Sequence, residues 1–500
     1  MRNQPQRSPG VSAAGFERPT IETDVAVIGG GAAGLYVALR AAEHGAEATL
    51  VSRKPLTESA SFWAQGGLAA ALAPDDSPAR HAQDTLNAGR GLCRSEAVEM
   101  LTREAPGAVA ELRERGVRFD PDPASPDGAP SLALEGGHSA RRIVHAGGAQ
   151  TGRAITGRLA QLVAESERIR VLEETSALAL WSDGSECAGV MTDTGPIAAR
   201  ATVLATGGGA ALWQRTTNPW GAIGAGAVLA HAAGAALADL EFCQFHPTAL
   251  ALPGSGHDGT LLTEALRGEG AELLDASGRR FTDELAPRDQ VAAAILDRMD
   301  ADGTDHVALN LRSILPERFP NVFEACRAAG FRPESQPVPV APAAHYLMGG
   351  VVCDLDSATT LPRLYAVGEC SCSGAHGANR LASNSLSECF VFGARAAAAA
   401  AAATGLEQLP PPPRWRFEPP TVLTREAVWR QAGPRRDADA LEGLLDDPYP
   451  LARLIARTAL ARRESRGPHQ RSDHPLQDPA LDGVHVVIDA DESARFERWP

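Results

Sequence analysis

The chain has 500 residues, 44% hydrophobic and 22% charged, a balance that excludes a mainly disordered protein and is typical of a globular protein of two or three domains. Its formal net charge of −15 argues against nucleic acid or an anionic membrane as the main partner. The eight cysteines are dispersed, with no CxxC pair and no zinc pattern, so we expect reduced thiols, a cytoplasmic location and no metal site. Neither a signal-peptide pattern nor a run of 18 apolar residues is present, so we expect no membrane span.

Residues 1–20 are predicted to form a flexible tail, and the first structured segment is Thr23–Val51. This stretch reads as a buried strand, a glycine-rich turn, a helix and a second strand, which is the order of a dinucleotide-binding unit. The turn satisfies GxGxxG. Its first glycine permits the tight turn, its second lets the backbone approach a pyrophosphate, and its third allows close packing of helix on strand. The residues of the turn are Gly29, Gly30, Gly31, Ala32, Ala33 and Gly34.

The end of the second strand does not carry the acidic ribose ligand that usually accompanies such a turn. Ser52, Arg53 and Lys54 stand there instead. A cation at this place also suits a phosphorylated nicotinamide cofactor. The glycine turn alone therefore leaves both FAD and NADP open.

Two later segments, residues 201–210 and 363–371, also read as a strand followed by glycine. Three such turns predict one sheet whose carboxyl ends share a ligand crevice. The residues between them, 241–345, mix helix and strand patterns and are predicted to form an inserted domain. An alanine-rich stretch ending at residue 403 favours a helix. A proline-rich linker at 406–421, a helical region at 422–475 and an extended tail at 476–500 complete the predicted order.

A loop after the second strand has small residues around an AQGG core, and it could lie against a flat aromatic ring and offer backbone amides to it. Its notable residues are Ala60, Ser61, Ala64, Gln65, Gly66 and Gly67. Together with the glycine turn, this loop resembles the flavoprotein family of succinate dehydrogenase, fumarate reductase and L-aspartate oxidase. The similarity continues in unbroken order over about residues 21–475. It includes His246-Pro247-Thr248, Leu262–Gly270, Pro287-Arg288-Asp289, His345-Tyr346, Gly377–Leu386 and Ser465-Arg466-Gly467.

The resemblance implies an α/β fold with FAD as the cofactor. A Rossmann-like FAD-binding domain (21–240 and 346–405) would carry an inserted α+β capping domain (241–345) and a short C-terminal helical region. Besides the turn and loop residues, the family's flavin contacts match Glu369, Ser385 and Leu386, and Arg53 at the end of the second strand is a further cofactor-binding candidate. Ala60 stands where covalent-flavin members carry histidine, so the resemblance implies non-covalent FAD.

Within the family, the segment Leu134–His145 is similar to that of members that oxidise L-aspartate. The respiratory members typically have an uncharged residue at the position of Glu135. This similarity implies oxidation of L-aspartate to iminoaspartate, the first step of the route through quinolinate to NAD. Electrons would pass to oxygen, giving hydrogen peroxide, or to fumarate. The product could be handed to quinolinate synthase.

A substrate with two carboxylates requires fixed cations and neutral donors, and arginine can bind a carboxylate with two hydrogen bonds. The candidate donors are Arg380, His345, His246 and Thr263. Arg288 resembles the arginine that exchanges the proton in the family, a role that requires an unusual environment or a relay because free arginine is a poor base. Glu264 lies in the same family motif as Thr263, and Glu135 is the expected partner of the substrate's α-ammonium group.

Two alternatives remain open at this point. One is a soluble fumarate reductase or succinate-oxidising flavoprotein. The other is a flavin-binding protein whose activity has decayed, because Ala225 replaces an aspartate that contacts FAD in the family and the helical region is shorter than the family's three-helix bundle. The arginine-rich stretch 453–471 would suggest nucleic acid in isolation, but in an acidic chain it favours a packed, salt-bridged face.

Overall fold

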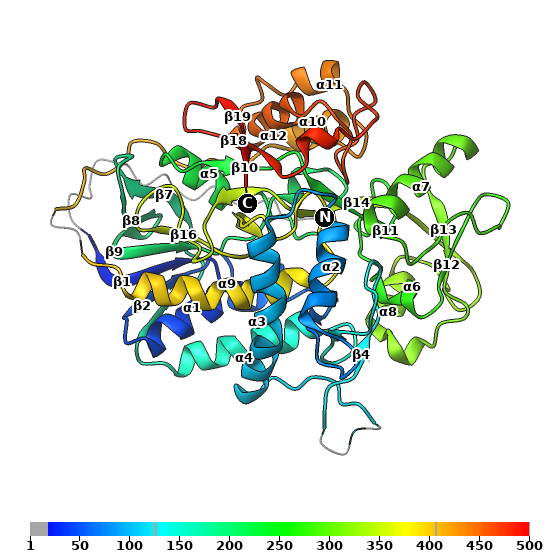
Figure 1. The fold of residues 1–500 in the computed structure, drawn as a ribbon, viewed down its shortest axis with the longest axis horizontal. Helices are drawn as coiled ribbons and strands as arrows, with labels where there is room; N and C mark the ends of the chain where they lie inside the picture. Colours follow the sequence, from blue (N-terminus) through cyan, green and yellow to red (C-terminus); the bar gives the residue numbers. More distant parts are fainter. Residues whose placement is uncertain (1–18, 124, 126–127, 406–407, 500) are drawn as a thin grey trace.

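The computed structural model describes residues 19–123, 125, 128–405 and 408–499. Most of the expected tail (residues 1–18) and the start of the expected linker (406–407) lie outside the described residues. Figure 1 shows the main sheet and its helices on the left, the inserted domain on the right, and the C-terminal helices above.

The largest sheet contains all three predicted strand-and-glycine segments. Among the described residues its order is β6-β2-β1-β9-β8-β7, and β16 also pairs with β9. These strands are β1 (Ile21–Ile28), β2 (Ala48–Val51), β6 (Ile169–Leu172), β7 (Ala177–Ser182), β8 (Cys187–Thr192), β9 (Gly195–Leu204) and β16 (Leu364–Ala366). Ile28 pairs with Leu204, and Leu204 with Ala366, in parallel register. The three glycine turns therefore follow the carboxyl ends of neighbouring parallel strands, which confirms the prediction that they belong to one sheet.

Alternation along β1 divides the core between the two faces of the sheet. Val25 and Val27 belong to an apolar cluster that includes residues of four helices, whereas Ala26 and Ile28 belong to the cluster on the opposite face. The four helices are α1 (Ala32–Glu43), α3 (Ser95–Glu114), α4 (Thr151–Glu165) and α9 (Asn384–Ala401). The alanine-rich stretch predicted to be helical forms the end of α9, which packs along α1.

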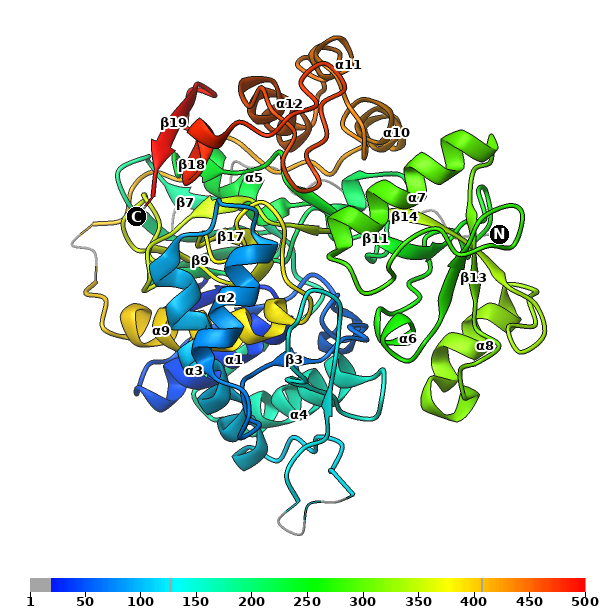
Figure 2. The same ribbon diagram turned by 45° about the vertical axis from the view of Figure 1, so that its right-hand side comes forward.

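The inserted domain, hereafter the cap, has its own antiparallel sheet in the order β11-β14-β13-β12. Its elements are β11 (Cys243–Leu250), α6 (Ala265–Gly268), β12 (Glu272–Leu274), α7 (Arg288–Asp302), β13 (Val307–Asn310), α8 (Pro320–Ala328) and β14 (Val338–Leu347). A separate apolar cluster holds it together, as expected of a folding unit of its own. Figure 2 shows the cap beside the main sheet, joined to it through β11 and β14.

The C-terminal part differs from the expectation of an extended tail. After helices α10 (Val422–Gln431), α11 (Ala438–Glu442) and α12 (Pro450–Ala461), the chain forms β18 (Val484–Ile488) and β19 (Ala494–Arg498). β18 pairs with β10 (Leu237–Ala238), which continues the sheet through β15 (Gly350–Val352) to β17 (Ser371–Cys372). The apolar side chains of Val486, Val487 and Ile488 are buried, which explains why this segment packs against β10. The stretch 453–471 is a packed, salt-bridged face, as predicted, because Arg462 and Arg466 are fully buried in ion pairs.

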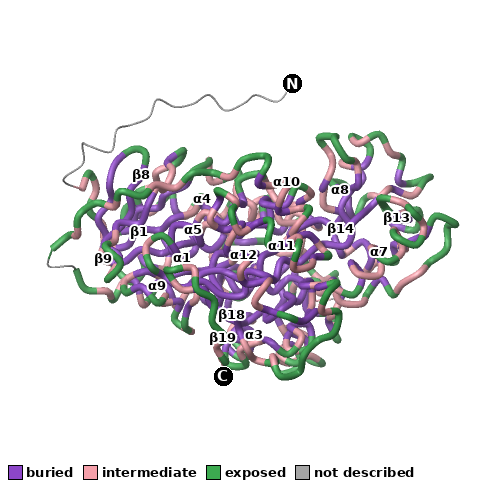
Figure 3. The backbone as a smooth tube through the Cα atoms, turned by 90° about the horizontal axis from the view of Figure 1, so that it is seen from above, coloured by how far each residue is buried: buried purple, intermediate pink, exposed green. Residues whose placement is uncertain are grey.

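Smaller elements complete the fold: β3 (Leu68–Ala69), α2 (Pro78–Ala88), β4 (Leu132–Ala133), β5 (Ile143–Val144) and α5 (Ala225–Ala232). Buried residues run through the middle of the molecule and into the cap (Figure 3). Among the described residues we find no helix with the length and hydropathy that a membrane crossing requires.

Candidate active site and cofactor cleft

A cavity of about 820 Å³ begins at the carboxyl ends of the parallel strands of the main sheet and extends to the cap. Arg53 and Trp220 line one end of it, and Arg288 and His246 of the cap line the other. Its position at the carboxyl ends of parallel strands is the usual ligand site of such sheets. The cavity therefore places a nucleotide-binding region and a set of charged cap residues in one continuous space.

The glycine turn forms one wall of this cavity. Gly29 has φ +122°, a conformation that favours glycine, and a Cβ at Gly30 would lie 2.6 Å from the Ser52 hydroxyl. Gly31 caps helix α1 without any side-chain hydrogen bond, so the first backbone N–H groups of the helix are free to bind a phosphate. The turn residues from Gly29 to Ala33 line the cavity. They fit the pyrophosphate of a dinucleotide.

Two glycines of the predicted cofactor-binding set lie in close contact with neighbouring backbone. A Cβ at Gly34 would lie 1.8 Å from the Gly29 carbonyl oxygen, which agrees with its predicted role between helix and strand. A Cβ at Gly67 would lie 2.2 Å from the Val144 carbonyl oxygen, because β3 and β5 approach closely there. Neither residue lines the cavity, unlike the other predicted members of the loop, Ala60, Ser61, Ala64, Gln65 and Gly66.

The remaining predicted flavin contacts also line the cavity: Arg53, Glu369, Ser385 and Leu386. Burial raises the pKa of Glu369 to about 7, although its carboxylate accepts a hydrogen bond from the Leu347 backbone N–H at 3.0 Å. Arg53 donates to the Gly221 carbonyl at 3.0 Å, at the end where Ala225 stands in the wall.

Several buried polar atoms on the cavity wall have no hydrogen-bond partner within the described protein. They are Gln65 Oε1, Thr206 Oγ1 and Arg380 Nε. Because a buried polar group without a partner is costly, such atoms are expected where a polar ligand binds. Together with the N-terminus of α1, which has no side-chain cap, these atoms show that the residues present fit a dinucleotide. Thr206 was missed by the sequence analysis, although it precedes the glycines at residues 207–209.

Two arginines meet at the cap end of the cavity. Arg288 at the start of α7 donates from Nη1 to Gln244 Oε1 at 2.9 Å, and Arg380 donates from Nη2 to the same oxygen at 3.2 Å. The Arg380 guanidinium carbon lies 4.4 Å from the centre of the Tyr346 ring. Burial and the neighbouring charge of Arg288 lower the pKa of Arg380 to about 10, so it remains positive at neutral pH.

Arg288 is also paired with a carboxylate. Its Nε donates to Glu264 Oε2 at 2.6 Å, and Glu264 Oε1 lies 3.0 Å from Arg267 Nη2. The predicted site residues Arg288, Glu264 and Arg380 are thus brought together, and Thr263 lines the cavity beside them. Gln244 was missed, although its place two residues before His246 puts both on one face of β11.

The two predicted histidines face each other with ring centres 5.0 Å apart. Burial, together with the positive charges of Arg288 and other arginines, holds the pKa of both His246 and His345 well below the usual value, so both rings are neutral. The Thr248 backbone N–H donates to His246 Nδ1 at 3.3 Å, which leaves the proton of that neutral ring on Nε2. His345 Nδ1 lies 2.7 Å from the Thr217 hydroxyl.

Glu135 lies in the cavity wall with a relative exposure of 2%. The Ser383 hydroxyl donates to its Oε2 at 2.6 Å, and His145 Nε2 is 3.5 Å from its Oε1. Burial raises the pKa of Glu135, but His145, Ser383 and the charge of Arg288 lower it to about 2, so the group is an anion at neutral pH. Ser383 and His145 were both missed, since only the folded chain brings them to Glu135.

The comparisons with known proteins agree with this geometry. The family described as FAD binding domain matches residues 24–386, and the one described as fumarate reductase flavoprotein C-term matches residues 427–497. The chain is 42% identical to L-aspartate oxidase from Streptomyces coelicolor, over 94% of this chain and 91% of that protein. It is 45% identical to L-aspartate oxidase from Caulobacter vibrioides, over 95% and 97% respectively. The chain belongs to the L-aspartate oxidase family of FAD-binding flavoproteins. Its cofactor is FAD, as predicted.

Solved structures show the same fold. The chain is similar to Escherichia coli quinol fumarate reductase FrdA with a TM-score of 0.86 and 29% identity, over 96% of this chain and 97% of that one. Mycobacterium smegmatis Sdh1 matches with a TM-score of 0.78 and 33% identity, over 93% and 91%. These matches confirm the predicted fold class.

Proposed function

We propose that the chain oxidises L-aspartate to iminoaspartate with FAD and passes the electrons to oxygen or fumarate. One observation carries the proposal: an ionised, buried carboxylate, Glu135, shares a cavity with the cationic Arg288 and Arg380. L-Aspartate has two carboxylates and one ammonium group, so its charges complement this set. The chain's family membership supports the same substrate, because the relatives named above are L-aspartate oxidases.

Recognition of the substrate would rest on fixed donors. Arg288 and Arg380 share Gln244 Oε1 as an acceptor and both line the cavity, where each could bind a carboxylate. His246 adds a neutral Nε2–H donor, so it can orient a carboxylate oxygen without adding a further charge. Glu135 would bind the α-ammonium. Succinate lacks that group and would leave the buried carboxylate without the ammonium charge.

The chemistry removes two electrons and two protons from the substrate. When bound, FAD supplies the acceptor for the hydride that leaves the α-carbon. The chain's own residues would take the proton from nitrogen, and Arg288 is the candidate. Because a guanidinium cation has no free site for a proton, Arg288 could take this one only while passing one of its own to Glu264, to which its Nε donates at 2.6 Å. This contact supports a relay behind the arginine. Thr263, at the cavity wall, completes the group of proposed binding residues.

The proposed metabolic role follows from the product. Iminoaspartate is the precursor that condenses toward quinolinate and NAD, and we propose its transfer to quinolinate synthase. We further propose a cytoplasmic location. The eight cysteines are all free, seven of them buried, which is compatible with a reducing compartment.

A product assay tests this function. FAD-loaded protein in air should convert L-aspartate and oxygen into iminoaspartate, detected as oxaloacetate and ammonia after hydrolysis, with one hydrogen peroxide for each turnover. Reduction of fumarate by dithionite-reduced protein, without aspartate oxidation, would identify a fumarate reductase instead. Bound FAD with neither activity would identify a flavin-binding protein with decayed catalysis.

A further inference from the structure

The arginines that reach the cavity are positioned from behind by residues that do not line it. Gln244 Oε1 accepts from both Arg288 and Arg380, and therefore sets the spacing between the two guanidinium groups. The amide nitrogen of Gln244 is fixed in turn, since it donates to Asn379 Oδ1 at 2.9 Å and to the Arg380 carbonyl at 2.8 Å. A rotation of this amide would replace its shared acceptor with a donor facing two cations.

Asn379 connects this amide to the first turn of α7. Its Nδ2 donates to Asp289 Oδ1 at 3.3 Å and to the Ala88 carbonyl at 3.2 Å. Asp289 follows Arg288 in sequence, so the hydrogen bonds that hold its carboxylate also tether the first turn of α7, which carries Arg288. Asp289 is thus linked through Asn379 to the Gln244 amide that spaces the arginines, and through the backbone to Arg288.

Asp289 belongs to the cap, and its main partner, Arg90, belongs to the other side of the cleft. Arg90 donates from Nε and Nη2 to the two carboxylate oxygens at 2.8 and 2.9 Å. The pair is partly buried, with side-chain exposures of 23% for Arg90 and 7% for Asp289. It is a two-bond contact between the loop after α2 and the first turn of α7.

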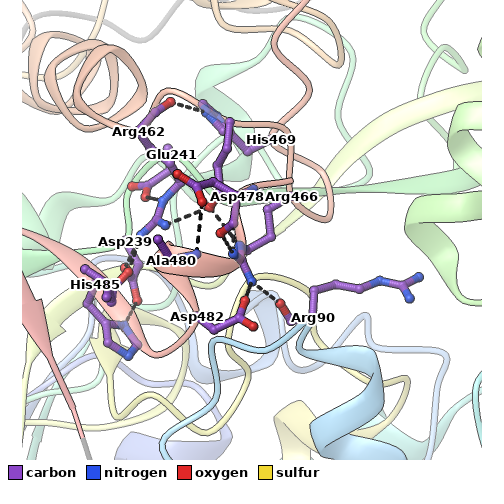
Figure 4. A network of polar contacts seen from close by, with 12 residues as sticks. Arg90, Asp239, Glu241, Arg462, Arg466, His469, Asp478, Ala480, Asp482 and His485 are labelled. Carbon is purple, nitrogen blue, oxygen red and sulfur yellow. Dashed lines mark hydrogen bonds and ion pairs between the residues drawn. The ribbon is translucent and has the colours of Figure 1, made fainter. Parts of the chain in front are cut away.

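The backbone of Arg90 is held in an unusual conformation. Its φ is +56°, in the left-handed region that favours glycine. Its carbonyl accepts a hydrogen bond from Arg466, which is fully buried among acidic groups of the C-terminal region. Figure 4 shows Arg90 at the edge of this cluster with its side chain pointing away from it. The cluster thus anchors the base of Arg90 and leaves its guanidinium to reach the cap.

We propose that the Arg90–Asp289 ion pair is a latch that holds the cap against the FAD-binding domain and positions Arg288 for proton transfer. Arg90, Asp289 and Asn379 are then positioning residues, because none of them lines the cavity. The proposal rests on the proposed function for its kinetic test, and it also predicts a change in flavin access that needs no substrate.

A second ion pair on the same helix provides a matched control. Arg435 of the C-terminal region pairs with Asp297 and Asp300 of α7. Its side chain is 44% exposed and those of the two aspartates are 74% and 69% exposed. These groups have no bond to Gln244 or Asn379. Exposed pairs contribute little, so Arg435→Gln should leave turnover within two-fold of the parent.

The test compares the FAD-loaded parent with Arg90→Gly, Arg90→Lys, Asp289→Asn, the Arg90→Gly/Asp289→Asn double variant and Arg435→Gln. Glycine suits the backbone at position 90, so Arg90→Gly removes the guanidinium without adding backbone strain. We expect Arg90→Gly and Asp289→Asn each to lower kcat for aspartate by about 10- to 100-fold, as for a small misplacement of a reacting group. FAD affinity should stay within two-fold, and Arg90→Lys should retain an intermediate rate because it keeps the charge but loses the two-bond geometry.

The double variant distinguishes a latch from two independent defects. If the pair acts as a unit, its kcat will match that of the slower single variant within about two-fold. Iodide should also quench the fluorescence of bound flavin more strongly in both single variants than in the parent or Arg435→Gln. Multiplying losses, unchanged kcat and quenching, or an equal loss in Arg435→Gln would overturn the latch. If the parent does not oxidise aspartate, the proposed function fails, and the quenching comparison still decides the latch.

Discussion

Replacing Glu135 with glutamine is the most discriminating change at the site. The substitution keeps the shape of the side chain and its contact with the Ser383 hydroxyl, but removes a buried negative charge. Removing one member of a buried, hydrogen-bonded charge pair costs about 2–5 kcal/mol. Since about 1.4 kcal/mol is a factor of ten, kcat/KM for L-aspartate should fall at least ~30-fold.

The opposite result is expected for a substrate without an ammonium group. Fumarate reduction by the reduced flavin should be unchanged or faster in Glu135→Gln, because the unpaired carboxylate no longer opposes binding of the dianion. Because the pKa of Glu135 is about 2, the parent's preference for aspartate should persist throughout the neutral and mildly acidic range. Ser383→Ala, which keeps the charge and removes one hydrogen bond, is the matched control and should have a smaller effect on aspartate.

The assay is steady-state kinetics with both substrates at one pH and ionic strength. A parallel loss for aspartate and fumarate would refute the reasoning. It would mean that Glu135 only braces the loop around residues 136–142.

Four further outcomes are expected. Because Ala60 cannot form a histidyl link, acid or heat should release all FAD into the supernatant; flavin that stays with the precipitated chain would contradict this. Arg288→Leu should lower kcat by about 10²–10⁴-fold, as for loss of a general acid–base group, whereas a raised KM with unchanged kcat would make Arg288 a binding residue only. Ala225→Asp should tighten FAD about 10-fold or more in titrations of the apoprotein, since a charged hydrogen bond contributes roughly 1.5–3 kcal/mol, and equal or weaker binding would count against this role. The buried Glu369 has a folded pKa of about 7, above its usual 4.5, so the folded apoprotein binds the extra proton and loses stability as pH rises through that interval. In urea unfolding of the apoprotein, Glu369→Gln should therefore gain stability relative to the parent between pH 4.5 and 7 and show a constant difference above it; a difference independent of pH would contradict the assignment.

Much of the nucleotide-binding half could be predicted because its signals are local. A buried strand, a glycine turn and a helix within residues 21–51 define β1, α1 and β2 without reference to the rest of the chain. The side-by-side carboxyl ends of β1, β9 and β16 could be predicted from three repeats of the same local pattern. The family motifs then indicated most of the residues that line the cavity.

The supporting residues could not be predicted because their partners are distant in sequence. Ser383 lies 248 residues from Glu135, and Gln244 lies 136 residues from Arg380. Neither pairing leaves a local pattern. Gly67 has a recognisable motif, but its restriction comes from the approach of β5, which only the folded chain shows. The C-terminal strands were missed because a short apolar run does not reveal the sheet edge that will receive it.

The proposed function requires that this FAD-binding cleft accept electrons from L-aspartate. The most direct measurement is rapid mixing of the oxidised holoprotein with L-aspartate in the absence of oxygen, with flavin absorbance as the signal. The proposed function predicts full bleaching with L-aspartate, and bleaching at least ~30-fold slower with succinate at the same concentration, on the scale of one lost buried charge pair. Flavin that stays oxidised with L-aspartate, or that is bleached faster by succinate, would contradict it.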